Sequence, residues 1–150
     1  MILQNFKVFT PRGRLLGLDW GACRTGVAVS DASGDFVFAR PPIVTAANDT
    51  DALVNSVVEI IAGENISGIV IGLPLRTDGT ESEATAAVRK FANTLATRTE
   101  IPIVFIDETL SSMSAQEQMG RIRVHDIKEK LDSNAARVIL ENAIAMMRRG

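Results

Sequence analysis

The chain alternates short, continuously apolar runs with longer stretches in which apolar residues recur at helical spacing. Near its start, apolar runs at 15–18 and 25–30 flank a short polar connection, which predicts two strands joined by a tight turn. A third strand is predicted at 35–39, and the dipeptide Pro41-Pro42 is expected to end it. The first part of the chain therefore predicts three strands in succession.

Helices and strands alternate in the remainder of the chain. Asp49 or Thr50 can cap a helix that ends near Gly63, and the apolar run SGIVIGLPL then predicts a central strand covered on both faces. The later predicted elements are a helix at 81–97, a strand within IPIVFID, and helices at 112–119 and 132–148. This order predicts an α/β fold, with a mixed central sheet and helices on both faces.

The length and composition indicate one compact domain. The chain has 150 residues, of which 46% are hydrophobic, and we expect a single domain over 1–150 with a peripheral N-terminal segment at 1–13. No apolar run approaches the roughly 18 residues that cross a bilayer, and the first residues do not resemble a signal peptide. The one cysteine, Cys23, fits a reducing compartment. We therefore expect a cytoplasmic protein without membrane contact.

The charge balance limits the kind of polyanion contact that the chain can make. The formal net charge is -2, so the overall basic surface of most nucleic-acid-binding proteins is lacking. Any contact with a nucleic acid must therefore be local. The single cysteine and the single histidine, His125, also argue against a zinc site.

Acidic residues stand where predicted strands end. Asp19 follows the first strand, and Asp107 and Glu108 follow the fifth. Binding sites in open α/β sheets form beyond the carboxyl ends of the parallel strands, so these acids are candidates for a site. A further acid, Asp132, shares a helical stripe with small and apolar residues and can therefore face the sheet.

Carboxylates that converge on one point would repel one another, and a bound divalent cation usually neutralises this repulsion. Mg²⁺ or Mn²⁺ suits hard oxygen ligands, and a pair of such ions can activate water and stabilise the leaving oxygen in phosphodiester cleavage. On this hypothesis Asp19, Glu108 and Asp132 are the catalytic metal ligands. Asp107 is either a further ligand or a neighbour that orients one.

Each of these acids also has a structural interpretation. Asp19 can form an Asx turn, and Asp132 can be the N-cap of the last helix. Asp107 and Glu108 can favour the N-terminus of the helix that follows them. The coincidence of all of them with predicted sheet ends favours a site.

Four blocks of the sequence resemble the YqgF family, also called RuvX-like. The blocks are LGLDWGACRTGVAVSD, GLPLRTDGTES, DETLSS and LDSNAARVIL, and they occur in the family's order. The family is described as Holliday junction resolvases or as nucleases that mature the precursor of small-subunit ribosomal RNA. The resemblance implies a ribonuclease H-like fold with a five-stranded sheet, and a metal-dependent nuclease acting on structured RNA or branched DNA.

The resemblance also assigns roles by position, with two departures. The family's first-strand acid matches Asp19, its Asp-Glu pair matches Asp107 and Glu108, and its C-terminal helix acid matches Asp132. The chain has Thr109 where the family usually has arginine, and Cys23 where it frequently has lysine. These departures put in doubt one contact with a phosphate group or one ionic contact that holds a carboxylate in place.

Basic residues near the predicted acids are candidates for substrate binding. Arg24 can hold a phosphate or a neighbouring carboxylate, although an ordinary surface arginine is an equal alternative. Arg121, Arg123 and Lys128 join the elements that bear Glu108 and Asp132, and can contact a phosphate backbone. Acidic residues are interspersed among them, so a solvated loop is the alternative.

Two other functions fit parts of the sequence. A non-catalytic nucleic-acid or ribosome-assembly factor would explain the low basic charge, but not the retained acids. A nucleotide-binding domain similar to actin or sugar kinases could use DWGACRTG as a phosphate loop, but the chain lacks the second glycine-rich motif. A junction resolvase would work as a homodimer and an RNA-trimming enzyme as a monomer, and the sequence leaves both open.

Overall fold

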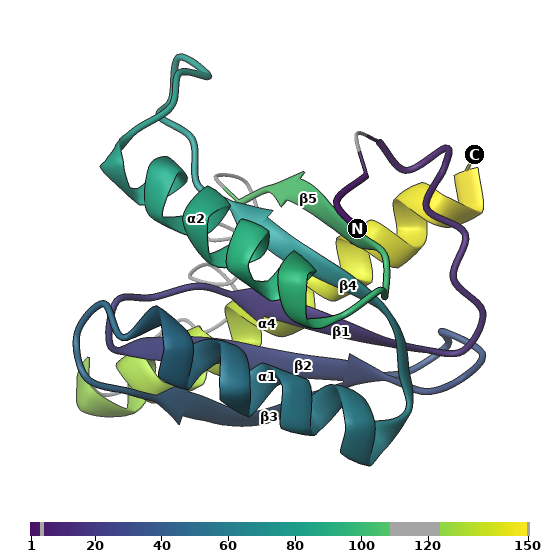
Figure 1. Cartoon of the computed structure of the whole chain (residues 1–150), viewed down its shortest axis with the longest axis horizontal. Coiled ribbons are helices and arrows are strands. Elements are labelled where there is room, and N and C mark those ends of the chain that lie inside the picture. Colours follow the sequence, from purple (N-terminus) through teal and green to yellow (C-terminus); the bar gives the residue numbers. More distant parts are fainter. Residues whose placement is uncertain (4, 109–123, 150) are drawn as a thin grey trace.

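The structure is a computed structural model that describes residues 1–3, 5–108 and 124–149, without the side chains of 124–133 and 149. Helices and strands alternate after three initial strands, as the sequence predicts (Figure 1). In chain order the elements are β1 (Arg14–Asp19), β2 (Arg24–Ser30), β3 (Val37–Val44), α1 (Thr50–Glu64), β4 (Ile66–Leu73), α2 (Glu83–Arg98), β5 (Ile103–Asp107) and α4 (Val124–Arg149).

The strands form one mixed five-stranded sheet in the order β3-β2-β1-β4-β5. The pairs β1–β2 and β2–β3 are antiparallel, whereas β1–β4 and β4–β5 are parallel. The predicted α/β fold with a mixed sheet is therefore confirmed. The carboxyl ends of β1, β4 and β5 consequently meet at one edge of the sheet, which we call the carboxyl edge.

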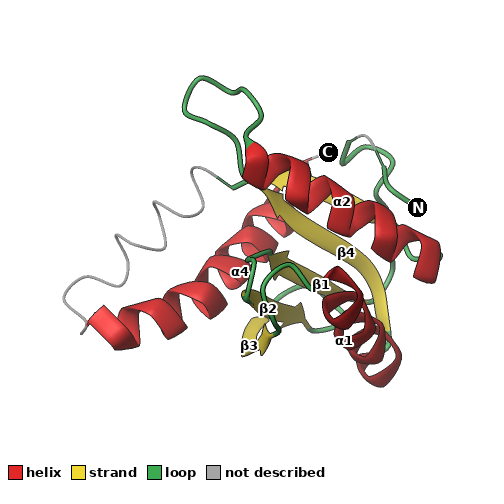
Figure 2. Cartoon of the chain, turned by 60° about the vertical axis from the view of Figure 1, so that its left-hand side comes forward, coloured by secondary structure: helices red, strands yellow, loops and turns green. Residues whose placement is uncertain are grey.

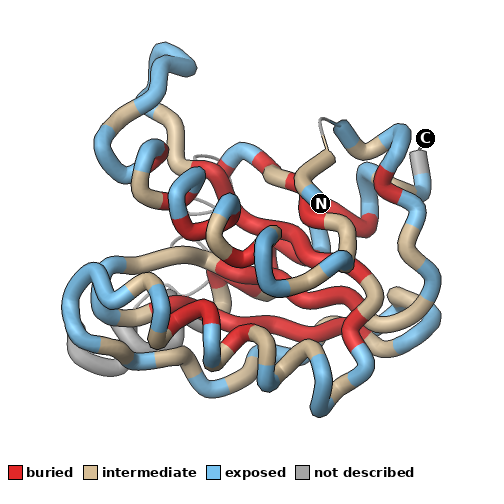
Figure 3. The backbone as a smooth tube through the Cα atoms, viewed as in Figure 1, coloured by how far each residue is buried: buried red, intermediate tan, exposed pale blue. Residues whose placement is uncertain are grey.

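Helices cover both faces of the sheet (Figure 2). The helices α1 and α2 pack on one face and α4 on the other, which gives two apolar layers, here named the α1–α2 core and the α4 core. Figure 3 shows buried residues concentrated in the inner strands β1, β2 and β4, whereas the edge strand β3 is more exposed. None of the described helices has the length and hydropathy needed to cross a membrane.

Two element boundaries differ from the sequence predictions. Strand β3 continues through Pro41 and Pro42 to Val44, so the prediction that the prolines end it is wrong. An edge strand tolerates proline because its outward N–H groups need no partner, and the pairing with β2 is irregular at this point. Helix α4 begins at Val124 rather than near Asp132, because residues 124–131 contain no glycine or proline and continue the helix.

The N-termini of α1 and α2 are capped by side chains. Asp49 accepts a hydrogen bond from the Ala52 backbone N–H at 3.1 Å, as the sequence predicts for α1. Ser82 and Thr85 form a reciprocal capping box at the start of α2. The Thr85 hydroxyl also donates to the carbonyl oxygen of Pro74. The loop between β4 and α2 is thus closed at its base.

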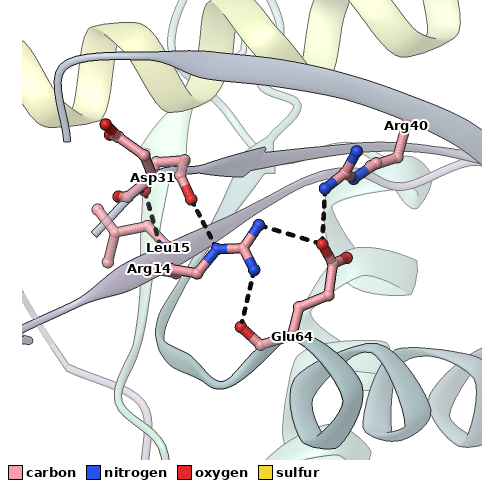
Figure 4. A network of polar contacts seen from close by, with 6 residues as sticks. Arg14, Leu15, Asp31, Arg40 and Glu64 are labelled. Carbon is pink, nitrogen blue, oxygen red and sulfur yellow. Dashed lines mark hydrogen bonds and ion pairs between the residues drawn. The ribbon is translucent and has the colours of Figure 1, made fainter. Parts of the chain in front are cut away.

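A polar network fixes the C-terminal end of α1 to the sheet (Figure 4). The Arg14 guanidinium donates to the Glu64 carbonyl oxygen at 3.3 Å and to Glu64 Oε1 at 3.2 Å. It also donates to the Ser30 carbonyl oxygen, and Arg40 Nη2 donates to the same Oε1 at 2.7 Å. One glutamate of α1 therefore binds arginines from β1 and β3.

The N-terminal segment packs against the sheet. The Leu3 N–H donates to the Ile103 carbonyl oxygen at 2.7 Å, and the Ile103 N–H donates to the Met1 carbonyl oxygen at 2.8 Å, beside β5. Phe9 is 1% exposed and belongs to the α4 core. Residues before β1 therefore contribute to the apolar interior.

Candidate active site

The carboxyl edge brings the ends of three strands together. Leu18 on β1 pairs with Ile71 on β4, so the next residues, Asp19 and Gly72, are neighbours across the two strands. On the other side of β4, Gly72 pairs with Ile106 near the end of β5. The candidate acids of β1 and of the end of β5 therefore flank one glycine.

Asp19 lies on the face of the sheet that α4 covers. Two positions earlier, a Cβ added at Gly17 would lie 2.9 Å from Leu140 Cβ of α4, and two positions before that, Leu15 belongs to the α4 core. Because side chains alternate along a strand, Asp19 faces the same way. Its antiparallel partner is Gly26, which places no side chain beside the carboxylate.

Glu108 bends over β4 toward Asp19. Its backbone N–H donates to the Leu73 carbonyl oxygen at 3.2 Å, and its side chain is on the α4 face, since Val104 and Ile106 belong to the α4 core. A Cβ at Gly72 would lie 3.3 Å from both Cγ and Cδ of Glu108. Only a residue without a side chain leaves this space to the carboxyl group.

The Glu108 carboxyl group is removed from water. The residue is 8% exposed, and the apolar Ile139 of α4 packs over the same point of β4, 2.7 Å from the Cβ position of Gly72. This burial raises the pKa of Glu108 to about 7 from its ordinary value of 4.5. A positive charge placed beside the group would favour its ionised form.

The side chains of Asp107 and Glu108 lie on opposite faces of the sheet, because side chains alternate along a strand. Asp107 is exposed and shares its side of β5 with Phe105, which packs against the α1–α2 core. Glu108 lies on the opposite face, with Asp19. The sequence left both acids as candidates, because the residues two and four positions before each of them are apolar and the pattern does not separate the two faces.

The turn between β1 and β2 is built on a close backbone approach. A Cβ at Gly21 would lie 2.1 Å from the Arg24 carbonyl oxygen, so no side chain fits there. The buried Thr25 closes the turn, because its Oγ1 accepts from the Gly21 N–H at 3.4 Å and donates to the Gly21 carbonyl oxygen at 3.5 Å. The sequence patterns did not identify Thr25 as the residue that closes this turn. Cys23 is exposed at the tip.

Arg24 is held at the sheet rather than extended into water. It begins β2, is half-buried and has a buried Nε atom. By alternation with Gly26 and Ala28, it lies on the α4 face, as Asp19 does. The role of Arg24 in binding phosphate or carboxylate stays a prediction.

The remaining predicted site residues lie at the limits of what the structure describes. Asp132 lies within α4, which begins at Val124, so the alternative that Asp132 is the helix N-cap is wrong. Its side chain and that of Lys128 are outside the described residues, and so are Arg121 and Arg123. Their roles stay predictions.

The described acids suit a hard cation but do not complete a site for one. Among the residues with described side chains, no group of three histidine, cysteine, aspartate or glutamate residues is placed to hold a metal ion. Asp19 and Glu108 nevertheless bring carboxylate oxygens to the same face of the carboxyl edge, and Gly26 and Gly72 leave space beside them. Oxygen donors of this kind are those that Mg²⁺ and Mn²⁺ prefer.

Comparison with known proteins identifies the family. The family model described as "RuvX: Holliday junction resolvase" matches residues 13–146, which include every described acid of the site. The chain belongs to the RuvX family. The predicted resemblance to RuvX-like proteins is thereby confirmed.

Curated members of the RuvX family match almost the whole chain. A protein of Maridesulfovibrio salexigens named "Putative pre-16S rRNA nuclease" is 41% identical over 134 residues, covering 88% of this chain and 98% of its own. A protein of the same name from Orientia tsutsugamushi is 37% identical over 149 residues, covering 97% of this chain and 92% of its own.

Solved structures share the fold at much lower identity. A Thermus thermophilus RuvC structure in complex with a Holliday junction substrate has a TM-score of 0.59 at 10% identity, covering 92% of this chain and 97% of that one. A Fowlpox virus resolvase in complex with Holliday junction DNA has a TM-score of 0.50 at 12% identity, covering 89% of this chain and 99% of that one. The predicted ribonuclease H-like fold is confirmed.

Proposed function

We propose that this RuvX-family protein is a nuclease that hydrolyses phosphodiester bonds with water, using Mg²⁺ or Mn²⁺. The observation that carries the proposal is the buried Glu108 carboxyl group, which lies over Gly72 and beside Asp19 at the carboxyl edge. Burying an acid without a cationic partner destabilises a fold, and such groups concentrate at functional sites. The names of the family and of its curated members agree with this activity.

The acids Asp19, Glu108 and Asp132 are the proposed cation ligands. Asp132 comes one helical turn before Ala136, which belongs to the α4 core, and this spacing supports the proposal that Asp132 shares the stripe of α4 that faces the sheet. When bound, a divalent cation supplies positive charge that lowers the pKa of water and stabilises charge on phosphate. We assign Asp107 no direct ligand role, because it is exposed on the other face.

The protein's own residues prepare the site for a polyanion. Ile139 and the sheet exclude water from one side of Glu108, which strengthens its interaction with any cation. Gly21 and Thr25 hold the turn that begins beyond Asp19. Arg24 provides a half-buried guanidinium on the same face for a phosphate oxygen.

We propose precursor ribosomal RNA as the substrate in preference to a DNA junction. The two relatives described above, both named as pre-16S rRNA nucleases, are 41% and 37% identical and cover 88% and 97% of this chain. The junction-bound structures are 10–12% identical, a level at which only the fold is shared. A monomer suffices for trimming one RNA strand, so the proposal does not require a homodimer.

In the test, the purified protein is incubated separately with end-labelled pre-16S RNA and with a labelled four-way DNA junction. Each reaction is run with Mg²⁺, with Mn²⁺ and with a chelator. We expect discrete RNA cleavage that needs the metal and is lost in Glu108→Gln. Cleavage of the junction alone would overturn the choice of substrate. Metal-dependent cleavage of neither substrate would favour a non-catalytic assembly factor.

The metal site has a test that does not depend on cleavage. Millimolar Mg²⁺ or Mn²⁺ is expected to raise the melting temperature of the wild type, because an ion that binds only the folded state stabilises it. The shift is expected to disappear in Asp19→Asn. An equal shift in both proteins would place the ion elsewhere.

A further inference from the structure

A groove lies at the opposite end of the sheet from the acids, between the N-terminal segment and the last turns of α4. Its volume is about 830 Å³, which is within the range of ligand-binding pockets. Figure 1 shows the N-terminal segment running beside the C-terminal end of α4. The nuclease proposal uses none of the residues that line this groove.

The walls of the groove are apolar and anchored. Phe6 and Phe9 meet edge to face with their ring centroids 6.0 Å apart, and Phe9 is 1% exposed. Phe9 also packs on β4, where a Cβ at Gly68 would lie 2.9 Å from its Cζ. From the other side, Met146 and Met147 of α4 provide unbranched side chains that adapt to varied shapes.

The same end of the molecule exposes two apolar side chains. Met146 is 41% exposed in the groove, and Val8, within the segment that forms its wall, is 57% exposed. Met146 therefore leaves apolar surface inside the groove that another molecule can contact.

The charged side chains that line the groove, among the described residues, are all positive. Lys7 and Arg12 line it and are exposed, and no described aspartate or glutamate is among the lining residues. Arg12 also lines an adjoining hollow of about 320 Å³, together with Arg148. Within the part of the chain that the structure describes, neither the Lys7 nor the Arg12 side chain has an ion-pair partner. A cationic groove on a chain of net charge -2 is complementary to an acidic ligand.

We propose that this groove binds an acidic peptide segment of a partner protein, with an aliphatic or aromatic side chain seated between Phe6 and Met146. The apolar walls would bury the anchor, while Lys7 and Arg12 would bind flanking carboxylates. Nucleic acid fits less well, because its affinity depends on many phosphate contacts and the described residues give the groove two basic side chains. The proposal is independent of the nuclease activity.

Binding is tested by fluorescence anisotropy on the full chain with three fluorescein-labelled peptides of equal length. All carry a central Leu-Phe pair, which is flanked by glutamates in the first peptide, by glutamines in the second and by lysines in the third. We expect the glutamate peptide to bind most tightly. Arg12→Glu is expected to weaken it by about tenfold or more, and Met146→Glu is expected to remove binding, because it places a charge where the anchor sits. The control Lys90→Glu changes an exposed lysine of α2 and should leave the affinity unchanged.

Three results would overturn the proposal. One is equal affinity for the three peptides, and another is an affinity for the glutamate peptide that Arg12→Glu leaves unchanged. The third is a different occupant of the groove. An oligonucleotide would displace the bound peptide, and a second copy of the chain would give a dimer in sedimentation that Met146→Glu dissociates. RNA cleavage by Arg12→Glu, measured in parallel, should equal that of the wild type, so the two proposals fail separately.

Discussion

Replacing Glu108 by glutamine should stabilise the metal-free protein at neutral and alkaline pH. In the folded state burial raises the pKa of Glu108 to about 7 from 4.5. Ionising this group is therefore less favourable in the folded state than in the unfolded chain. At about 1.4 kcal/mol per pKa unit, the full effect is about 3 kcal/mol. Glutamine keeps the shape of the side chain and removes the ionisation.

The direction of the pH dependence follows from proton binding. Between about pH 4.5 and 7 the folded state holds more protons on Glu108 than the unfolded state, so the stability of the wild type falls as the pH rises through this range. Below it, both states are protonated and the glutamine variant gains nothing. The stability difference between variant and wild type should therefore grow from near zero at about pH 4 to about 3 kcal/mol at about pH 8.

The assay is urea-induced unfolding of both proteins across this pH range, with a chelator present. Glu59→Gln, on an exposed position of α1, is the matched control because it removes the same charge from a site exposed to water. A stability difference for Glu108→Gln that does not change with pH would refute the reasoning. A glutamine variant less stable than the wild type at about pH 8 would refute it more strongly.

Further variants test how the site is supported. Gly17→Ala should destabilise the protein by about 1–3 kcal/mol in urea unfolding, because its Cβ would lie 2.9 Å from Leu140 Cβ of α4. Thr25→Val should cost about 1 kcal/mol by the same assay and slow RNA cleavage, because it removes both hydrogen bonds to Gly21, whereas Thr25→Ser should retain most of the activity. Arg14→Met should lower the unfolding free energy by roughly 1 kcal/mol, a modest value because the ion pair at the end of α1 is partly exposed to water.

The order and type of the described elements were predictable because their patterns are local. The continuous apolar run of β4 indicates a strand covered on both faces, and Asp49 caps α1 as its position suggests. The path of β3 was not predictable, because proline is tolerated only where a strand lies at the edge of a sheet, and strand order is a property of the whole fold. Helix 112–119 lies outside the described residues and stays a prediction.

The site was predictable as a location but not as an arrangement. The strand ends marked Asp19 and Glu108, but the bend of Glu108 over Gly72 depends on the pairing of β4 with β5, which the sequence does not state. The role of Thr25 in the turn also depends on a close backbone approach at Gly21 that no periodicity reveals. The burial that raises the pKa of Glu108 arises from α4, an element distant in sequence.

The central claim is that Asp19, beside Glu108, holds the cation that cleavage requires. Its most direct test is the single-turnover rate of pre-16S RNA cleavage by Asp19→Asn, compared with the wild type and with Asp51→Asn, which changes an exposed aspartate of α1. Loss of a group that stabilises charge in the transition state lowers rates by about 100-fold or more, and we expect such a fall for Asp19→Asn with a melting temperature in chelator that is unchanged or slightly higher. Asp51→Asn should cleave at the wild-type rate. Cleavage by Asp19→Asn at the rate of Asp51→Asn would contradict the account.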